Sequence, residues 1–512
     1  MPPTLPPTDQ PRQPPPAPRK GEENPKPMPL RICQIAAEVT PFAKTGGLGD
    51  VTAGLSRALG RQGHDVRLFL PFYARVAKLD FPFVAVDFLR DIEIHLGPRK
   101  FTYSIFTTRL PESDVDTYFV HCPALYHHEA IYSGEWDEYL RYALLTRAAL
   151  ECCQRMGWAP DIVHVHDWHT ALAPIYLRTI YAWDRLFART RTVLTLHNLG
   201  YQGVFSTQVL EEIGLAGHAE MLFNEDLAAS RVSFLKTGLL YADALSTVSR
   251  TYAQEIQTPE HGFGLDPLLR ARASHLVGIV NGVDYGVWSP EADPYIPHKY
   301  SAERLEGKES TKRALLEKIG MPFPRQAPVL GLVSRLTAQK GLDLLFDTLP
   351  EFLYHRDLRF IALGSGEERY ESFLSWLQVT FPGKVWYFRG YSEELSHWIE
   401  AGADIFLMPS RYEPCGLNQM YSLRYGTPPV VRRTGGLADT VEQWNPVTRT
   451  GTGFSFDHFT PEGLRWALDF ALTAYRDVPA WKQLMLNGMA KDFSWARQVR
   501  PYEELYRRLL AG

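Results

Sequence analysis

A short apolar run at residues 405–408 leads into a polar loop whose side chains could do chemistry. The run has the length of a strand, Glu413 and Cys415 follow it, and Gly416 opens a helical pattern. In a parallel sheet the loop beyond a strand's carboxyl end lies at the ligand crevice, and the exposed N–H groups of the next helix favour an anionic or hydroxyl-rich ligand. We therefore expect Glu413 and Cys415 to lie where the chemistry occurs.

Glu413 alone is compatible with three roles: a catalytic carboxylate, a group that binds hydroxyls, or a buried structural acid. A hydrolase of glycosides would need a second carboxylate at a defined distance from the first. Asp167, in the other half of the chain, could be that partner. The positions of the two residues in the sequence do not give the distance between them, so these roles stay open at this point.

Arg335 and Lys340 flank a loop that directly follows another apolar run, at residues 329–333. A pair of fixed cations suits a diphosphate, because Arg can grip two oxygens and Lys acts as a point charge. Gly-rich loops at residues 364–366 and 433–436 end two further strands. Each loop alone is equally compatible with ordinary solvated surface. Together, three strand ends with suitable donors predict a site for phosphate.

Histidines cluster in the first half, at residues 164–169 and at His197. Such a set suggests a metal site, but His164 and His166 alternate along a strand that should be buried, and no acidic or cysteine cluster completes a metal shell. We therefore predict no metal ion and expect hydrogen-bonding groups for a polyhydroxylated substrate. His197, beside Asn198 at the tip of a strand, is the best single candidate, although a lone histidine is equally compatible with a structural role.

Strands that alternate with helical patterns must position these loops, and they indicate parallel sheets with helices on both faces. The alternation occurs twice, which predicts an α/β chain with two domains, at residues 29–280 and 281–490. Each domain contains one cationic Gly-Gly loop. Residues 1–28 are rich in Pro and are predicted to be a disordered tail. Residues 491–512 are predicted to form a final amphipathic helix on a domain surface.

Composition argues against several classes of partner. The chain has 54 Lys and Arg against 58 Asp and Glu, and this net charge of −4 argues against nucleic acid or an anionic membrane as a partner. No apolar run approaches the roughly 18–20 residues of a membrane span, and no secretory signal pattern is present, so we expect a soluble cytoplasmic protein. Five cysteines without a C-x-x-C pair argue against structural zinc and a disulfide framework. The sequence does not indicate an oligomeric state.

Seven motifs follow one another along the chain, at residues 44–48, 166–169, 195–203, 281–284, 334–341, 409–417 and 433–440. In this order they resemble those of bacterial glycogen synthases, the family that includes plant starch synthases. The resemblance begins near Leu30 and runs to the end of the chain. One such match would be weak evidence, whereas seven in order are strong evidence.

The resemblance implies the GT-B arrangement, in which two Rossmann-like, doubly wound domains face each other across a deep cleft and the last helix crosses back to the first domain. It also implies transfer of glucose from ADP-glucose to the 4-hydroxyl at the non-reducing end of an α-1,4-glucan such as glycogen, with retention and release of ADP, without a cofactor. The alternatives are UDP-glucose as donor, a small acceptor, or a glucan-binding scaffold whose active site has decayed. We find no sequence context for the pyridoxal phosphate lysine of a glucan phosphorylase.

The resemblance also implies roles for residues at matching positions. Lys44 and the loop of Gly46 and Gly47 would contact the donor, with Asp50 supporting that loop. His197 would lie beside the reacting sugar and Asp167 would shape the site near it. Two further substrate-binding residues of the first half are expected: Asn198 and Asn281.

In the second half, Arg335 and Lys340 would hold the diphosphate. Glu413 would bind glucose hydroxyls. The residues expected alongside Glu413 are Cys415, Gly416 and Leu417, and those expected to complete the phosphate cradle are Thr434, Gly435 and Gly436. Related retaining transferases often have a second Glu eight residues after the first, where this chain has Tyr421. Tyr421 fits the glycogen and starch synthase branch.

Overall fold

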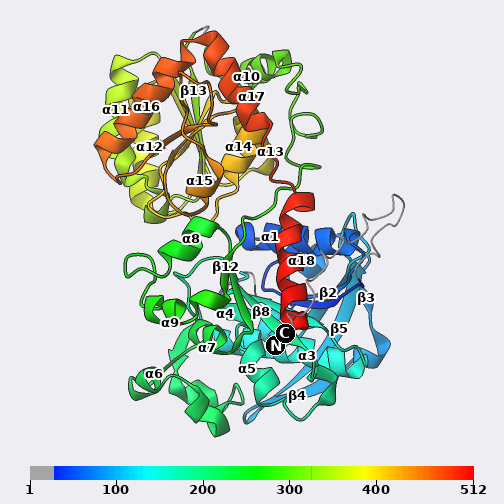
Figure 1. The fold of residues 1–512 in the computed structure, drawn as a ribbon. Helices are drawn as coiled ribbons and strands as arrows, with labels where there is room; N and C mark the ends of the chain where they lie inside the picture. The colour runs from blue at the N-terminus through cyan, green and yellow to red at the C-terminus, as the bar shows by residue number, and fades with distance from the viewer. Residues whose placement is uncertain (1–27, 129, 324–325) are drawn as a thin grey trace, which may run out of the picture.

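A computed structural model describes residues 28–128, 130–323 and 326–512. It contains two α/β units, each built on its own sheet, with the final helix returning to the first unit (Figure 1). The predicted α/β class with two Rossmann-like units is confirmed. The prediction of a disordered tail falls almost wholly on residues 1–27, which lie outside the described residues.

The first sheet has ten strands, in the order β12-β11-β8-β7-β1-β2-β6-β5-β3, with β4 paired to β5. The strands are β1 (Arg31–Ile35), β2 (Asp65–Pro71), β3 (Val84–Ala85), β4 (Ile92–Leu96), β5 (Arg99–Arg109), β6 (Asp116–His121), β7 (Ile162–His166), β8 (Arg191–Leu196), β11 (Ala244–Thr247) and β12 (Leu276–Gly278). The strands from β12 to β6 pair in parallel, and those beyond β6 pair antiparallel. Every residue of β7 is buried, as expected for a central parallel strand with helices on both faces.

Helices of the first unit connect these strands. They are α1 (Gly47–Arg61), α2 (Pro123–Tyr126), α3 (Glu138–Arg155), α4 (Asp167–Thr170), α5 (Ala173–Arg178), α6 (Asn224–Ala228), α7 (Phe234–Tyr241), α8 (Arg250–Glu255) and α9 (Asp266–Ala271). A small hairpin of β9 (Val204–Ser206) and β10 (Arg231–Ser233) lies in the connection between β8 and α7. Helix α1 begins at the Gly-Gly loop after β1, so this loop lies at a strand end, as the sequence predicts.

The second sheet is fully parallel and has the order β15-β14-β13-β16-β17-β18. Its strands are β13 (Val329–Val333), β14 (Arg359–Gly364), β15 (Val385–Arg389), β16 (Ile405–Met408), β17 (Pro429–Arg432) and β18 (Phe454–Phe456). Its helices are α10 (Glu306–Lys318), α11 (Asp343–His355), α12 (Glu368–Thr380), α13 (Glu393–Gly402), α14 (Asn418–Arg424), α15 (Gly435–Thr440), α16 (Pro461–Tyr475) and α17 (Val478–Met489). The chain reverses direction across the sheet between β13 and β16, and ligands of open α/β sheets bind at such a switch point.

Helix α18 (Trp495–Ala511) leaves the second unit and packs beside α1 on the first (Figure 1). Its apolar stripe buries Trp495, Val499, Tyr502 and Tyr506 in the core of the first unit. The Tyr506 hydroxyl lies 2.7 Å from Nδ1 of His164 on β7. The helix therefore links the end of the chain to a strand that leads into the site. Within the part of the chain that the structure describes, no helix is both long and apolar enough to cross a bilayer.

Helices α8 and α15 form a second connection between the units, in which each helix receives a carboxylate from the other. Glu255 of α8 accepts hydrogen bonds from the Thr434 hydroxyl (2.9 Å) and the Gly435 N–H (3.0 Å). In return, Asp439 of α15 accepts hydrogen bonds from the N–H and hydroxyl groups of Thr251 (3.0 and 2.6 Å) and from the Arg250 N–H. Carboxylates favour helix N-termini, so both pairs hold the two units together.

Candidate active site

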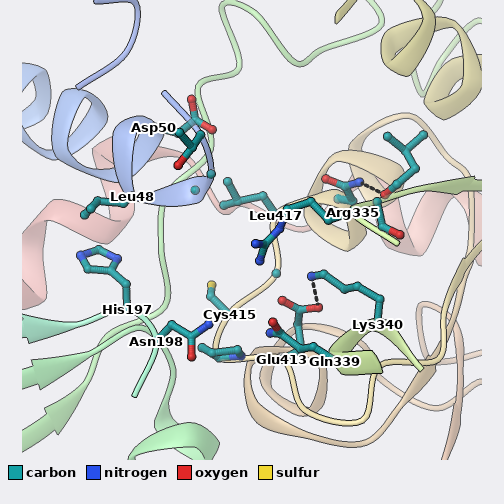
Figure 2. A pocket seen from close by; sticks show the side chains of 18 of the residues that line it. Leu48, Asp50, His197, Asn198, Arg335, Gln339, Lys340, Glu413, Cys415 and Leu417 are labelled. Atoms are coloured by element: carbon teal, nitrogen blue, oxygen red, sulfur yellow. Dashed lines mark hydrogen bonds and ion pairs between the residues drawn. The ribbon is translucent and has the colours of Figure 1, made fainter. Parts of the chain in front are cut away.

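A cavity of about 810 Å³ lies between the two units. Loops at the carboxyl ends of strands from both sheets line it, including those that follow β1, β7 and β8 in the first unit and β13, β14, β15 and β16 in the second. In Figure 2, His197 and Asn198 lie opposite Gln339, Lys340 and Glu413 across this cavity. The two-domain arrangement thus brings loops that are far apart in the sequence to one site.

The Gly-Gly loop after β1 is held in place by two carboxylates. Glu38 accepts hydrogen bonds from the Thr45 hydroxyl (2.7 Å) and the Gly46 N–H (3.2 Å). Asp50 pairs with Lys44, with Nζ and Oδ2 2.9 Å apart. Burial alone would lower the pKa of Lys44, but the Asp50 carboxylate outweighs burial and raises it, so Lys44 is a fixed cation on the cavity wall. Asp50 therefore holds Lys44 directly.

A buried chain of hydrogen bonds crosses the first sheet from β1 through the end of β7 to His197. Gln34 Oε1 lies 3.0 Å from Nε2 of His166, and Nδ1 of His166 lies 3.1 Å from Nε2 of His197. Burial lowers the pKa of His197 and of His164 to about 3, and holds that of His166 well below its usual range. All three imidazoles are therefore neutral near pH 7. Among the described residues, no group of three or more His, Cys, Asp and Glu side chains is placed to hold a metal ion.

Asp167 holds the backbone of the His197 loop. Its Oδ1 accepts hydrogen bonds from the N–H groups of His197 (2.7 Å) and Asn198 (3.4 Å), and its own φ of 52° lies in the left-handed region. Burial raises the pKa of Asp167 to about 7, against the effect of the two N–H donors. The Asp167 carboxylate thus binds backbone N–H groups of the first unit. This contact fits a residue that positions the His197 loop better than a catalytic partner of Glu413.

Lys340 and Glu413 lie together in the second unit. Lys340 Nζ is 2.7 Å from Glu413 Oε2, and the Ser410 hydroxyl donates to the same oxygen at 2.9 Å. Arg335 also lines the cavity, is exposed, and takes part in none of the ion pairs that the described residues form. The loops after β13 and β16 therefore bring two cations and one carboxylate to one wall, as the sequence predicts.

Thr434, Gly435 and Gly436 do not line the cavity, and their role in a phosphate cradle stays a prediction. A Cβ atom on Gly435 would lie 1.9 Å from the carbonyl oxygen of Glu413, and one on Gly436 would lie 2.0 Å from that of Cys415. The two glycines thus let this loop pack directly behind the Glu413 loop. Their N–H and hydroxyl donors face Glu255 and the backbone instead.

Two known families of domain match this chain in sequence. The family model of the starch synthase catalytic domain matches residues 31–271, and that of the glycosyl transferases group 1 matches residues 318–483. The glycogen synthase of Koribacter versatilis is 44% identical over 483 residues, which cover 94% of this chain and 98% of that protein. The glycogen synthase of Anaeromyxobacter dehalogenans strain 2CP-1 is 45% identical over 492 residues, which cover 94% and 100%. The chain belongs to the glycogen and starch synthase family.

Solved structures agree with this assignment. The catalytic domain of starch synthase IV from Arabidopsis thaliana, bound to ADP and acarbose, superposes with a TM-score of 0.87 at 33% identity, covering 95% of this chain and all of that one. The sucrose-phosphate synthase of Thermosynechococcus elongatus has a TM-score of 0.59 at 16% identity and shows the shared fold alone. The predicted GT-B architecture is confirmed.

Tyr421 stands where related transferases often have a second Glu, and the structure shows its surroundings. Its ring stacks on that of Trp288, with the centroids 4.0 Å apart and the planes 1° from parallel. Trp288 in turn stacks on His397 at 3.6 Å. Trp288 and Tyr421 both line the cavity. A pair of stacked aromatic rings therefore forms this part of the cavity wall.

The remaining predicted residues also lie at the cavity: Gly47, Asn281, Cys415, Gly416 and Leu417. Burial raises the pKa of the Cys415 thiol to about 12, so it is not a thiolate nucleophile. Several residues that line the cavity were not predicted from the sequence: Glu38, Trp288, Tyr391, Glu393 and Asn418. Glu38 and Tyr391 follow strand ends, so the rule that found the other loops could have found them. Trp288 lies in the connection between the units and has no such signal.

Proposed function

We propose that this protein transfers an α-glucosyl group from ADP-glucose to the 4-hydroxyl at the non-reducing end of an α-1,4-glucan, with retention and release of ADP. The convergence of Arg335, Lys340 and Glu413 with His197 in one cavity supports this proposal most directly. The family assignment supports the reaction class, and the ADP and acarbose bound to the Arabidopsis starch synthase IV support a nucleotide donor and an oligosaccharide acceptor.

In this proposal the cations assist departure of the diphosphate. As the bond between the anomeric carbon and the phosphate oxygen breaks, negative charge grows on the diphosphate, and Arg335 and Lys340 are placed to meet it. Preorganised charges of this kind stabilise a transition state without reorganising. Backbone N–H groups at the start of α14, where Gly416 and Leu417 line the cavity, add to this effect. We propose on this basis that the reaction needs no metal ion.

The other residues orient the sugar. Glu413 accepts hydrogen bonds from glucose hydroxyls, and neutral His197 offers a donor or acceptor beside the anomeric carbon. The acceptor 4-oxygen bonds to the anomeric carbon on the face from which ADP leaves, which retains the configuration. The proton of the acceptor hydroxyl passes to the departing phosphate oxygen, so no protein base is required. Asp167 holds the His197 loop during this step.

The test is incorporation of labelled glucose into glycogen from ADP-glucose and from UDP-glucose in parallel, with EDTA present. Wild type and Glu413→Ala are compared, with Glu368→Ala, an exposed residue of α12, as the matched control. We expect transfer from ADP-glucose in wild type and the control, and its collapse in Glu413→Ala. Transfer only from UDP-glucose would overturn the donor, activity that is present without EDTA and lost with it would overturn metal independence, and no incorporation into glycogen from either donor would overturn the acceptor.

A further inference from the structure

Three aromatic side chains from both units gather beside the cavity, and we call Tyr201, Phe263 and Tyr412 the aromatic lip; of the three, only Tyr201 lines the cavity itself. Tyr201 lines the cavity and is 58% exposed, and Phe263, between α8 and α9, is 43% exposed. Tyr412 directly precedes Glu413. The rings of Phe263 and Tyr412 meet edge to face across the two units, with centroids 5.7 Å apart and planes at 67°. The rings of Tyr201 and Phe263 thus remain partly exposed to solvent beside the proposed site for sugars.

The lip surrounds Gly200, which has no side chain. A Cβ atom added to Gly200 would lie 3.2 Å from Oδ1 of Asn198, 3.6 Å from the Tyr412 hydroxyl oxygen and 3.9 Å from Cε1 of Phe263. Gly200 itself is exposed. Polar and aromatic atoms therefore converge from three segments on one accessible space, as in sites that bind small molecules.

The backbone holds Phe263 in this position. Its φ of 49° lies in the left-handed region, which residues other than Gly rarely adopt. The Nε2 of Gln202 donates a hydrogen bond of 3.0 Å to its carbonyl oxygen, which ties the Phe263 loop to the loop that carries Tyr201. An exposed ring on an unfavourable backbone gains little from core packing. Such local strain points to a functional role.

The lip lies on the other side of the two cations from the loops that a nucleotide would follow. Arg335 and Lys340 follow β13, in the middle of the second sheet, and the loops after β14 and β15 line the cavity on one side of them with Ser365 and Tyr391. Tyr412 follows β16, on the other side of β13. A nucleoside diphosphate that starts at the cations and runs along the β14 and β15 loops leaves the lip free.

We propose that the aromatic lip binds the glucose units of the acceptor chain next to its reacting end, and that Phe263 sets how strongly those units bind. The C–H faces of a pyranose ring pack on aromatic rings, and the hydroxyls of Tyr201 and Tyr412 and the Asn198 amide offer hydrogen bonds to its hydroxyl groups. Because Tyr412 comes from the second unit and the other two from the first, a bound chain also bridges the units. This inference rests on the proposed glucan synthase function.

The test measures KM for the donor and for a series of maltooligosaccharides of increasing length, with kcat, in wild type and Phe263→Ala. We expect the acceptor KM of Phe263→Ala to rise roughly 3- to 10-fold, as for loss of one aromatic contact, with the ADP-glucose KM and kcat unchanged. Phe263→Tyr, which keeps a ring, should restore the acceptor KM. Tyr354→Ala is the matched control, because Tyr354 is 76% exposed on α11 and does not line the cavity.

Gly200→Ala is a second variant that adds atoms instead of removing them. Gly200 does not have a positive φ, so the added methyl strains no backbone; it fills the space within the lip and presses on Oδ1 of Asn198, 3.2 Å from its Cβ atom. We expect the acceptor KM to rise here as well, with the donor KM unchanged.

An acceptor KM within twofold of wild type in both variants, or an equal rise in the donor KM, would overturn the inference. Absence of transfer to any glucan by wild type would instead overturn the proposed function.

Discussion

Lys340 Nζ lies 2.7 Å from Glu413 Oε2, so a cation and a carboxylate on the cavity wall touch each other at the ends of two neighbouring strands. The Ser410 hydroxyl fixes the same carboxylate oxygen. The bond to be broken in a nucleotide sugar joins a phosphate to a sugar. In the proposed reaction this pair therefore marks where that bond would lie in the cavity.

Lys340→Ala should reduce kcat far more than it reduces stability. Loss of one preorganised charge at the departing group costs roughly 10²–10³-fold in kcat. Because the Lys340–Glu413 pair is mostly buried, a companion variant should keep the positive charge beside Glu413, and Lys340→Arg does so. Lys482→Ala, an exposed residue of α17, is the control and should retain wild-type activity. Steady-state kinetics with ADP-glucose measure the effect, and a kcat of Lys340→Ala within threefold of wild type would refute the role.

Glu255 should hold the units together from outside the cavity. Replacing Glu255 with Ala removes the acceptor of the Thr434 hydroxyl and the Gly435 N–H. Hydrogen bonds to charged groups contribute about 1.5–3 kcal/mol each. Without them we expect α15 to separate from α8 more often. Hydrogen exchange should then speed up in peptides that cover residues 434–440, with peptides of α12 unchanged. Equal exchange in wild type and Glu255→Ala would show that this contact does not hold the interface.

The two Gly-Gly loops show how much of the site could be predicted from the sequence. Both were placed at strand ends from local pattern, since a strand, a glycine loop and a helix are encoded by neighbouring residues. The loop of residues 44–50 indeed lines the cavity, whereas Thr434 and Gly435 turn toward Glu255. Which way a loop faces depends on a carboxylate about 180 residues away, and no local pattern encodes that partner.

The same limit applies to Asp167 and to the lip. The place of Asp167 beside His197 was expected. The left-handed backbone of Asp167 and its hydrogen bonds from the His197 and Asn198 N–H groups, however, depend on how β7 and β8 pair. Phe263 gave no signal at all, because it lies in a loop without strand or helix periodicity. Its meeting with Tyr412 requires the packing of both units. The antiparallel strands beyond β6 were likewise not predicted.

Gly435→Ala should impair activity although Gly435 lies outside the cavity. Its Cβ atom would lie 1.9 Å from the Glu413 carbonyl oxygen, and its φ of 45° disfavours any side chain. The Glu413 loop must then shift, which misplaces the carboxylate, and a displacement of about 1 Å can cost about 10²-fold in rate. Gly217→Ala is the matched control, because a Cβ atom there meets no other atom within 4 Å. Equal kcat for the two alanine variants would contradict this account.

His397 and Asp293 should make the stability of the second unit depend on pH. His397 Nδ1 lies 2.8 Å from Asp293 Oδ2, and both side chains are fully buried. Burial alone would lower the pKa of His397, but its bonds to Asp293 and Glu393 outweigh burial and raise the pKa above 6.5. The folded state therefore binds this proton more tightly than the unfolded state does. The resulting stabilisation is fully present below pH 6.5 and is lost as pH rises through the raised pKa of His397.

The measurement compares the free energy of unfolding in urea of wild type and His397→Gln from pH 6 to pH 9, followed by the intrinsic fluorescence of the 12 tryptophans, which include Trp288 stacked on His397. We expect the advantage of wild type over the variant to shrink as pH rises. His355→Gln, at an exposed position at the end of α11, should show no such dependence. An advantage that stays constant over this range would mean that His397 binds its proton no more tightly in the folded chain than in the unfolded one.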